Sequence, residues 1–180
     1  MRIIGGTLKG RRINPPSNLP VRPTTDLAKE SLFNILNNLI DFENIRVLDL
    51  FAGTGSISLE FASRQAESVV AVDLNFKCVE FIKKAARQFG LSSIVAYRTD
   101  VFRFLDKSPA TPFDLIFSDA PYDMQKIEQL PDLIFDKKWL NKDGLLIIEH
   151  PRGIDFANHS QFSQNRRYGK VNFSFFTNLP

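Results

Sequence analysis

The chain has 180 residues and a net charge of +3, and 43% of its residues are hydrophobic. This length suits one domain with a well-buried core rather than two. No apolar run approaches the ~20 residues of a membrane-spanning helix, and the single cysteine excludes both an internal disulfide and a cysteine-based metal cluster. The first residues lack the apolar stretch of a signal peptide. We therefore expect a cytoplasmic monomer without a structural metal.

Positive charge is concentrated at the N-terminus. Residues 1–22 contain five basic residues and no acid, so this segment carries +5 although the whole chain carries only +3. The five are Arg2, Lys9, Arg11, Arg12 and Arg22. A basic arm of this kind neutralises phosphates and releases counterions, which favours contact with nucleic acid. A solvated basic segment without a partner is the alternative, and charge alone does not decide between the two.

The N-terminal residues predict a short hairpin followed by a helix. Residues 2–4 and 11–13 are strand-like, and the glycines between them permit tight turns. After a loop, residues 23–26 supply the hydroxyl and carboxylate acceptors of a helix start. Apolar residues at helical spacing then predict an amphipathic helix that ends near Asn38. These residues are Leu27, Leu32, Ile35, Leu36 and Leu39.

From residue 45 onward, strand and helix patterns alternate. Strands are predicted at 46–51, 68–73, 94–98, 113–118 and 144–149, with helices at 57–64, 76–89, 101–105 and 127–135. This alternation is typical of an α/β fold with a mostly parallel sheet and right-handed crossovers. Residues 163–168 and 171–177 differ, because they predict an antiparallel hairpin at the sheet edge. We expect a single domain over 1–180, with an arm at 1–24, a helix at 25–40 and a core at 45–180.

The most informative segment is 47–56, VLDLFAGTGS, in which a buried strand leads into a turn with two glycines. Gly53 and Gly55 let the backbone approach a ligand closely and direct the amides of the next helix toward it. A dinucleotide site prefers a third glycine at position 58, which is Ser58 here, and Asp49 would repel a pyrophosphate. Asp49 would instead favour an ammonium group, such as the one in S-adenosylmethionine.

Two more acids follow later strands. Asp73 ends the second predicted strand, where a carboxylate can accept hydrogen bonds from both hydroxyls of a ribose. Asp100 follows the third strand and can accept from the amino group of an adenine. Either acid alone is more readily explained as a surface carboxylate or a helix cap. Three acids at the carboxyl ends of three successive strands favour a site for a nucleoside cofactor.

A second signal is the sequence DAPY at 119–122, at the end of the fourth predicted strand. The exocyclic amine of a base is a poor nucleophile because its lone pair is delocalised into the ring. Asp119 and a backbone carbonyl of Ala120 or Pro121 can accept its two hydrogens and direct the lone pair at a methyl group, while Tyr122 offers a face for stacking. Catalysis would then depend on alignment and electrostatics. Asp-x-Pro also forms ordinary turns, but behind a strand and beside the glycine loop it favours methyl transfer to nitrogen.

These features resemble class I S-adenosylmethionine-dependent methyltransferases, in particular amino methyltransferases with an Asp/Asn-Pro-Pro-aromatic signature. The match is closest to the RsmD family, which the chain resembles at 1–6, 9–12, 22–26, 32–36, 48–55 and 119–122. The resemblance covers most of the chain and thins after Glu149. It implies a Rossmann-like fold, S-adenosylmethionine as cofactor, and methylation of the 2-amino group of one guanine in the 16S ribosomal RNA of the small subunit.

The resemblance also implies roles for individual residues. Those lining the cofactor pocket would be Asp49, Phe51, Ala52, Gly53, Gly55, Asp73, Leu74, Asp100 and Val101. Residues 119–122 would hold the guanine, and the five basic residues of the arm would lie against RNA. One departure is that the family usually has proline where this chain has Ala120. The carbonyl of Ala120 remains and Pro121 favours an extended conformation before it, so we expect a looser turn with retained activity.

Three other interpretations remain open. An amino methyltransferase can act on adenine in DNA or on a glutamine side chain in protein, although the first usually needs a recognition domain and the second needs no basic arm. The chain could also be an RNA-binding or assembly factor that uses a methyltransferase scaffold without catalysis. A nicotinamide oxidoreductase is disfavoured, because Ser58 interrupts the glycine pattern and Asp49 opposes phosphate.

Overall fold

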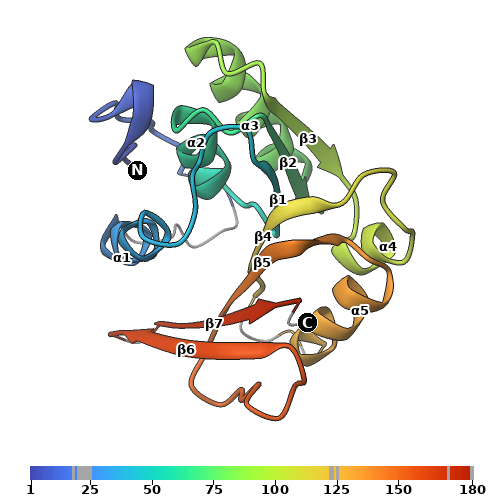
Figure 1. Cartoon of the computed structure of the whole chain (residues 1–180). Helices are drawn as coiled ribbons and strands as arrows, with labels where there is room; N and C mark the ends of the chain where they lie inside the picture. Colours follow the sequence, from blue (N-terminus) through green and yellow to red (C-terminus); the bar gives the residue numbers. More distant parts are fainter. Residues whose placement is uncertain (18, 20–25, 122–123, 125, 170, 179–180) are drawn as a thin grey trace.

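In the computed structural model of the chain, residues 1–17, 19, 26–121, 124, 126–169 and 171–178 are described. They form a seven-stranded sheet with the order β3-β2-β1-β4-β5-β7-β6 (Figure 1). Five strands are parallel: β1 (Arg46–Leu50), β2 (Ser68–Asp73), β3 (Ile94–Arg98), β4 (Phe113–Asp119) and β5 (Leu140–His150). The last two, β6 (Phe162–Tyr168) and β7 (Val171–Thr177), form an antiparallel hairpin that joins β5. The predicted α/β fold with a C-terminal hairpin is confirmed.

Helices cover both faces of the sheet. Successive strand residues point to opposite faces, and both faces carry buried apolar side chains that need to be covered. On one face lie α1 (Asp26–Leu36), α2 (Ser56–Ser63) and α3 (Phe76–Phe89), and on the other lie α4 (Val101–Leu105) and α5 (Leu130–Asp136). Two 3₁₀ turns, η1 (Gly6–Leu8) and η2 (Ile127–Gln129), complete the elements. Gly90 ends α3 in the left-handed conformation, with φ of 66°.

The buried face of α1 differs from the prediction. Leu27 and Leu39 are 74% and 50% exposed, while Lys29 and Phe33 are both 1% exposed. The helix ends at Leu36, before Leu39, and its buried face includes Lys29, a position that the predicted apolar spacing did not include. The reason is long-range, because the Lys29 ammonium lies 3.6 Å from the buried carboxylate of Glu60 on α2.

Two other boundaries differ from the sequence-based expectation. β5 begins at Leu140, four residues before the predicted strand at 144–149, and pairs there with Phe113. The predicted helix at 127–135 is divided into η2 and α5, because Pro131 at the start of α5 lacks an amide hydrogen and favours a helix start. Neither difference moves the ends of the strands that carry the candidate site.

The N-terminal arm, residues 1–17 here, folds back on itself as an antiparallel pair. Arg2 and Arg12 form an isolated bridge, and Ile3 N donates to Arg11 O at 2.9 Å, with η1 filling the turn. Ile3 and Ile13 are 2% and 6% exposed and pack on α2 and α3. The predicted hairpin is therefore present, as a short pairing whose apolar residues face the domain.

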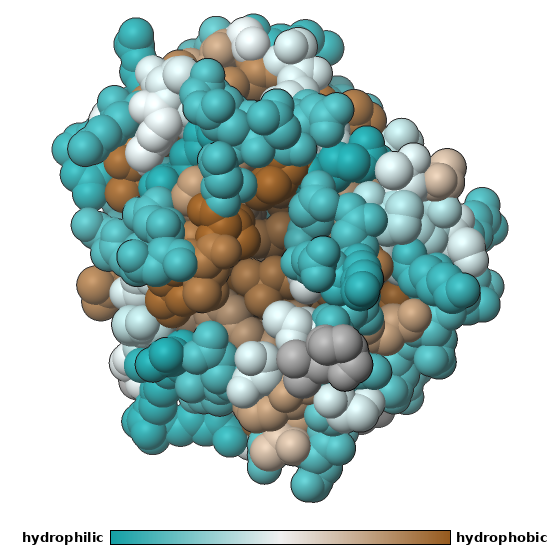
Figure 2. All heavy atoms as spheres, viewed as in Figure 1, coloured by the Kyte–Doolittle hydropathy of each residue, from teal (hydrophilic) through white to brown (hydrophobic). Residues whose placement is uncertain are grey.

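Hydrophobic side chains gather between α1 and the sheet and are surrounded by hydrophilic surface (Figure 2). The buried core cluster that α1 and α2 form with the sheet includes five phenylalanine side chains, namely Phe33, Phe61, Phe117, Phe173 and Phe175. None of the helices in the described part of the chain has both the length and the apolar character needed to cross a bilayer.

Candidate active site

The carboxyl ends of β1, β2 and β4 bring the predicted acids to one edge of the sheet. β1 lies between β2 and β4, with Leu50 paired to Val72 on one side and to Ser118 on the other. Asp73 and Asp119 each follow the residue paired to Leu50, so both lie level with the first residue of the loop after β1. Asp49 lies two residue pairs below them, paired with Ala71 and Phe117. Parallel sheets place ligands at this edge.

Three residues of the loop between β1 and α2 have left-handed backbone conformations. Phe51, Gly53 and Gly55 have φ of 58°, 52° and 70°, and Gly55 N donates to Ala52 O at 2.7 Å. A Cβ at Gly55 would lie 2.6 Å from Cγ1 of Ile82 on α3, so only glycine fits between the helices. The two glycines predicted to shape the loop therefore do so for conformational and steric reasons.

Asp73 connects the end of β2 to this loop. Its Oδ2 accepts from Gly53 N at 2.8 Å, and its Oδ1 accepts from Asn75 N at 2.7 Å. A carboxylate offers about four acceptor positions, so two remain for other donors. The neighbouring Leu74 is 64% exposed and presents apolar surface beside the carboxylate.

Asp49 is bound to the start of α2. Its Oδ2 accepts from the backbone N of Ser58 at 3.0 Å and from Ser58 Oγ at 2.5 Å, and the side chain is 2% exposed. Burial raises the pKa of Asp49 to about 7; the Ser58 hydrogen bonds oppose this shift, while Asp119 and Asp73 add to it. Within the described part of the chain, Oδ1 of Asp49 accepts no hydrogen bond. A cation would be a favourable partner for it.

The sequence DAPY is described as far as Pro121; Tyr122 lies outside the described residues. Asp119 is half-buried at the end of β4, and burial raises its pKa to about 6. Ala120 is 1% exposed, and the carbonyl of Pro121 accepts from Met124 N at 2.9 Å. Since the Pro121 carbonyl is already bonded, the Ala120 carbonyl is the better candidate for a second acceptor.

The remaining predicted cofactor residues have mixed surroundings. Asp100 caps α4, accepting from Arg103 N at 2.9 Å, which is the structural role considered as its alternative. Val101 is buried in the core. Phe51 is half-buried, and its ring meets that of Phe102 edge-on at 6.4 Å. Phe102 was not predicted; it follows Asp100 by two residues and contributes apolar surface beside the glycine loop.

Glu60 is a second residue that sequence reasoning missed. It is fully buried on α2, and its two oxygens accept from Ile4 N at 2.8 Å and Gly5 N at 2.7 Å of the arm. Lys29 Nζ donates to Arg2 O, and burial lowers the pKa of Lys29 while Glu60 opposes that shift. The arm is thus fixed to the same helix whose first turn binds Asp49. The signal in the sequence was an acid within an otherwise uncharged helix, SISLEFAS.

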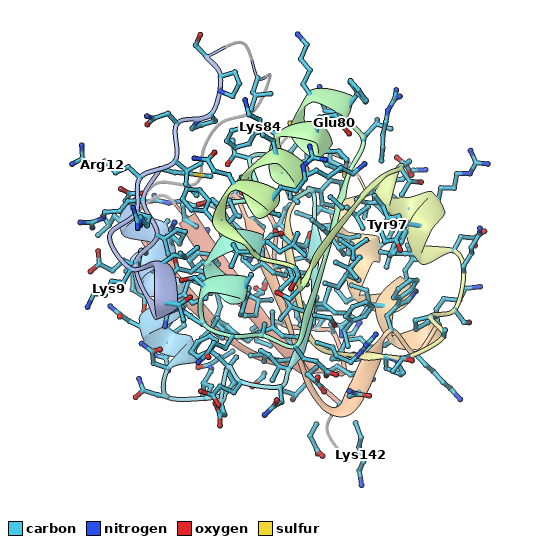
Figure 3. The ribbon with its side chains drawn as sticks, turned by 90° about the horizontal axis from the view of Figure 1, so that it is seen from above. Lys9, Arg12, Glu80, Lys84, Tyr97 and Lys142 are labelled. Atoms are coloured by element: carbon cyan, nitrogen blue, oxygen red, sulfur yellow. The ribbon has the colours of Figure 1, made fainter. Side chains whose placement is uncertain are left out.

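The basic side chains of the arm are directed to solvent. Arg2, Lys9, Arg11 and Arg12 are exposed, and Figure 3 shows Lys9 and Arg12 pointing away from the body of the molecule. None of the four forms an ion pair within the described part of the chain. Arg22, the fifth predicted contact, lies outside the described residues. The arm therefore presents four unpaired positive charges on one side of α2.

Comparison with known proteins identifies the family. Residues 1–177 match the family described as "Conserved hypothetical protein 95". The chain belongs to this family. Its relatives include YlbH of Bacillus subtilis, provisionally named as an rRNA methyltransferase, which is 37% identical over 86% of this chain and 85% of its own length. "Ribosomal RNA small subunit methyltransferase D" of Haemophilus influenzae is 34% identical over 83% of this chain and 78% of its own.

A solved structure shares the fold of this RsmD family member over its whole length. The Haemophilus influenzae protein HI0767, provisionally described as a methylase, superimposes with a TM-score of 0.81 at 28% identity, covering 99% of this chain and 98% of the other. The resemblance to the RsmD family and to class I methyltransferases, drawn from the sequence motifs, is confirmed. The arm belongs to the shared structure, since the coverage includes it.

Proposed function

We propose that this RsmD family protein transfers a methyl group from S-adenosylmethionine to the 2-amino group of one guanine in the RNA of the small ribosomal subunit. The names of its relatives support the reaction and the RNA. The family resemblance supplies the guanine and its amino group. The basic arm agrees with an RNA substrate, because four of its cations lack acidic partners among the described residues.

The observation that carries this proposal is the position of Asp119 relative to the glycine loop. β1 and β4 are adjacent and parallel, and Ser118 is paired with Leu50, so Asp119 lies level with Phe51 at the start of the loop. A nucleophile held by Asp119 would therefore meet a cofactor held by the loop.

The residues at the edge fit S-adenosylmethionine. Asp73 retains acceptor capacity for the two ribose hydroxyls, and Leu74 offers apolar surface for the adenine. Oδ1 of Asp49 would accept from the ammonium group, and Asp100 would accept from the adenine amino group with the carboxylate oxygen that does not cap α4. Bound there, the cofactor supplies a methyl group on a positively charged sulfur. The protein then has only to hold an amine within reach of that methyl group and to orient it.

Asp119 and the Ala120 carbonyl would orient that amine. Each accepts one hydrogen of the 2-amino group, so the lone pair turns out of the plane of the ring and toward the methyl group. A guanine reaches this site only when it leaves its stack. Transfer of the methyl group would leave a positive charge on the nitrogen beside Asp119, and the Asp119 carboxylate would stabilise that charge. The proton then leaves to Asp119 or to water.

Mapping of modified nucleotides tests the proposal. Ribosomal RNA from a strain that lacks this gene would be compared by mass spectrometry with RNA from its parent, and we expect one N2-methylguanine to disappear from the small-subunit RNA. The purified protein should restore it in small subunits from the deletion strain when S-adenosylmethionine is added. An unchanged map, or methyl transfer to DNA or to a glutamine instead, would overturn the assignment.

A further inference from the structure

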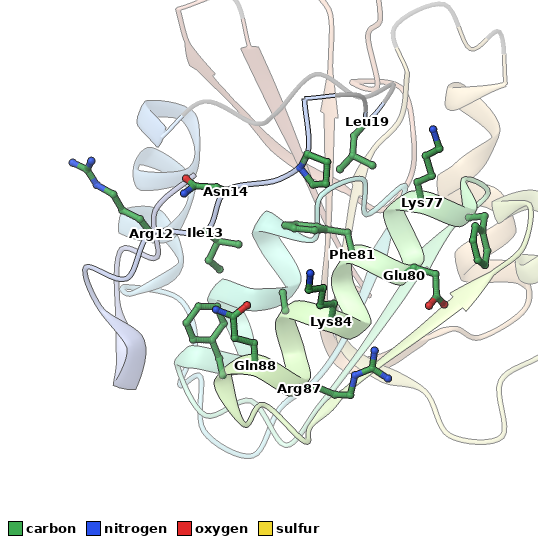
Figure 4. Close-up of a pocket in the computed structure, with 14 residues that line it drawn as sticks. Arg12, Ile13, Asn14, Leu19, Lys77, Glu80, Phe81, Lys84, Arg87 and Gln88 are labelled. Carbon is green, nitrogen blue, oxygen red and sulfur yellow. The ribbon is translucent and has the colours of Figure 1, made fainter.

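A cavity of about 580 Å³ lies between the N-terminal arm and α3, apart from the candidate active site (Figure 4). Residues of the arm around Ile13 and Asn14 form one wall, and the exposed side of α3 forms the other. A volume of about 300–1,000 Å³ is typical of sites that hold organic ligands. The cavity is therefore large enough for a nucleotide.

The lining of this groove is strongly basic. Arg12, Lys77, Lys84 and Arg87 are the four basic lining residues and Glu80 is the single acid, although the Arg12 side chain points away from α3 (Figure 4). Glu80 is paired with Lys83 at 3.3 Å, whereas none of the four lining cations forms an ion pair with any residue that the structure describes. Lys77 and Lys84 are exposed on α3, so their ammonium groups are available to an anion.

Aromatic and apolar side chains form the floor of the groove. Figure 4 shows the Phe81 ring and the Lys84 ammonium pointing from α3 toward the arm, with Leu19 near Lys77 at one end. Phe81 is only half-buried, and its ring packs beside Ile3 and Ile13 of the arm. Aromatic faces between cations are what proteins use to bind single-stranded nucleic acid, because bases stack on the rings while phosphates meet the cations.

The groove is connected to the candidate active site through α3. The helix begins three residues after Asp73, and Asn75 caps it by accepting from Lys77 N at 2.9 Å. Lys77 therefore lies at the end of the groove near the cofactor edge, and Lys84 lies about two turns farther along. A strand of RNA leaving the active site can follow this line of cations.

We propose that the groove between the arm and α3 binds a single-stranded RNA segment that flanks the target guanosine. Phosphates of the segment contact Lys77 and Lys84, and one base stacks on Phe81. The arm then serves as one wall of the groove as well as a charged surface. This inference rests on the proposed function for the identity of the RNA, but the groove itself can be tested without it.

Binding of a fluorescein-labelled single-stranded RNA of about a dozen nucleotides, followed by anisotropy at several salt concentrations, tests the groove. The double variant Lys77→Gln/Lys84→Gln should bind at least about tenfold more weakly at low salt. Its plot of log K against log salt should be shallower by about 1.4, because each lost phosphate contact removes about 0.7. Phe81→Leu, which keeps an apolar side chain, should weaken binding by about fivefold or more.

The matched control is Lys107→Gln/Lys142→Gln, which removes two exposed charges away from the groove; Lys142 lies at the opposite end of the molecule (Figure 3). Its affinity for the RNA should stay within about twofold of the unmodified protein, and calorimetric S-adenosylmethionine binding should be unchanged in every variant. If the groove variants and the control bind RNA alike with equal salt slopes, the groove is not an RNA site.

Methyl transfer into small subunits separates this proposal from the proposed function. The groove variant should raise KM for the subunits while kcat stays constant, because both lysines lie away from the reacting atoms. If the unmodified protein methylates subunits and the groove variant keeps its KM, the groove proposal fails alone. If the unmodified protein methylates nothing while groove substitutions still weaken RNA binding, the proposed reaction fails and the groove stands.

Discussion

The carboxylate of Asp73 accepts a hydrogen bond from the backbone amide of Gly53 at 2.8 Å, across the gap between β2 and the loop after β1. Its second oxygen accepts from Asn75 N, at the start of α3. One side chain therefore fixes both the glycine loop and the following helix. The residue proposed to bind the ribose is also the residue that keeps the loop in its left-handed shape, so cofactor affinity and loop order should change together.

Asp73→Asn should weaken both the binding of the cofactor and the order of the glycine loop. An asparagine can still accept from Gly53 N, but its amide group then faces Asn75 N as a second donor, which leaves two donors opposed. We expect the Kd for S-adenosylmethionine to rise at least tenfold and the unfolding free energy to fall by about 1–2 kcal/mol. Calorimetry and thermal denaturation measure these, with the exposed Asp143→Asn as the control. Full cofactor affinity in Asp73→Asn would contradict the assignment.

Asp49→Asn should stabilise the protein and abolish its cofactor binding. The pKa of Asp49 is raised from 3.8 to about 7, so between these values the folded state binds more protons than the unfolded state and the unfolding free energy falls as pH rises. The neutral asparagine removes this loss. At pH 8 the variant should be more stable by an amount on the order of a few kcal/mol, and at pH 3 the two proteins should be equal. Melting curves measured from pH 3 to pH 8 check whether the variant gains stability relative to the unmodified protein as pH rises. A variant that is less stable than the unmodified protein at pH 8 would contradict the prediction.

Asp119 should give the reaction a pH dependence. Its pKa of about 6 means that the carboxylate, the form that accepts from the amine, is lost as pH falls through 6. We expect kcat to rise between pH 5 and 7, within about one pH unit on either side of that pKa. Asp119→Ala should lower kcat about 100-fold with little change in cofactor affinity. Asp119→Asn keeps an acceptor oxygen but cannot titrate, so it should exceed Asp119→Ala in activity and lose the rise through pH 6.

The sheet and the edge that carries the site could be predicted from the sequence because their signals are local. Each parallel strand is a short apolar run, and the loop at Gly53 and Gly55 requires φ values that glycine adopts readily. Once the strands are parallel, the acids that follow them must share one edge, so the common position of Asp73 and Asp119 at that edge could be predicted without knowledge of any contact.

The contacts of Glu60, Lys29 and Ser58 could not be predicted, because each depends on a partner outside the residue's own helix. Glu60 is 56 residues from Ile4, whose amide it binds, and Ser58 is nine residues from Asp49. Spacing on α1 assigned core positions to leucines at the ends of the helix, whereas burial of Lys29 follows from the carboxylate opposite it. Helical periodicity shows which residues share a face, but not which charge that face will meet.

The glycines of the arm give a matched pair of substitutions that tests whether docking of the arm on α2 matters. A Cβ at Gly6 would lie 1.9 Å from the carbonyl oxygen of Ser63, whereas a Cβ at Gly10 would meet no atom within 4 Å. Both residues have positive φ, 71° and 85°, so alanine costs about 1–2 kcal/mol of backbone strain at either position. Gly6→Ala should cost more than this, because the clash with backbone also separates the arm from Glu60.

We expect Gly6→Ala to lower the melting temperature more than Gly10→Ala does and to expose the arm to limited proteolysis. It should also raise KM for small subunits, since the basic residues of the arm and one wall of the groove lose their fixed position. Gly10→Ala supplies the strain without the clash and should keep a protected arm. If the two variants have equal protease sensitivity and equal KM, backbone strain alone explains the behaviour of both variants. The contact between the arm and α2 then contributes nothing to substrate binding.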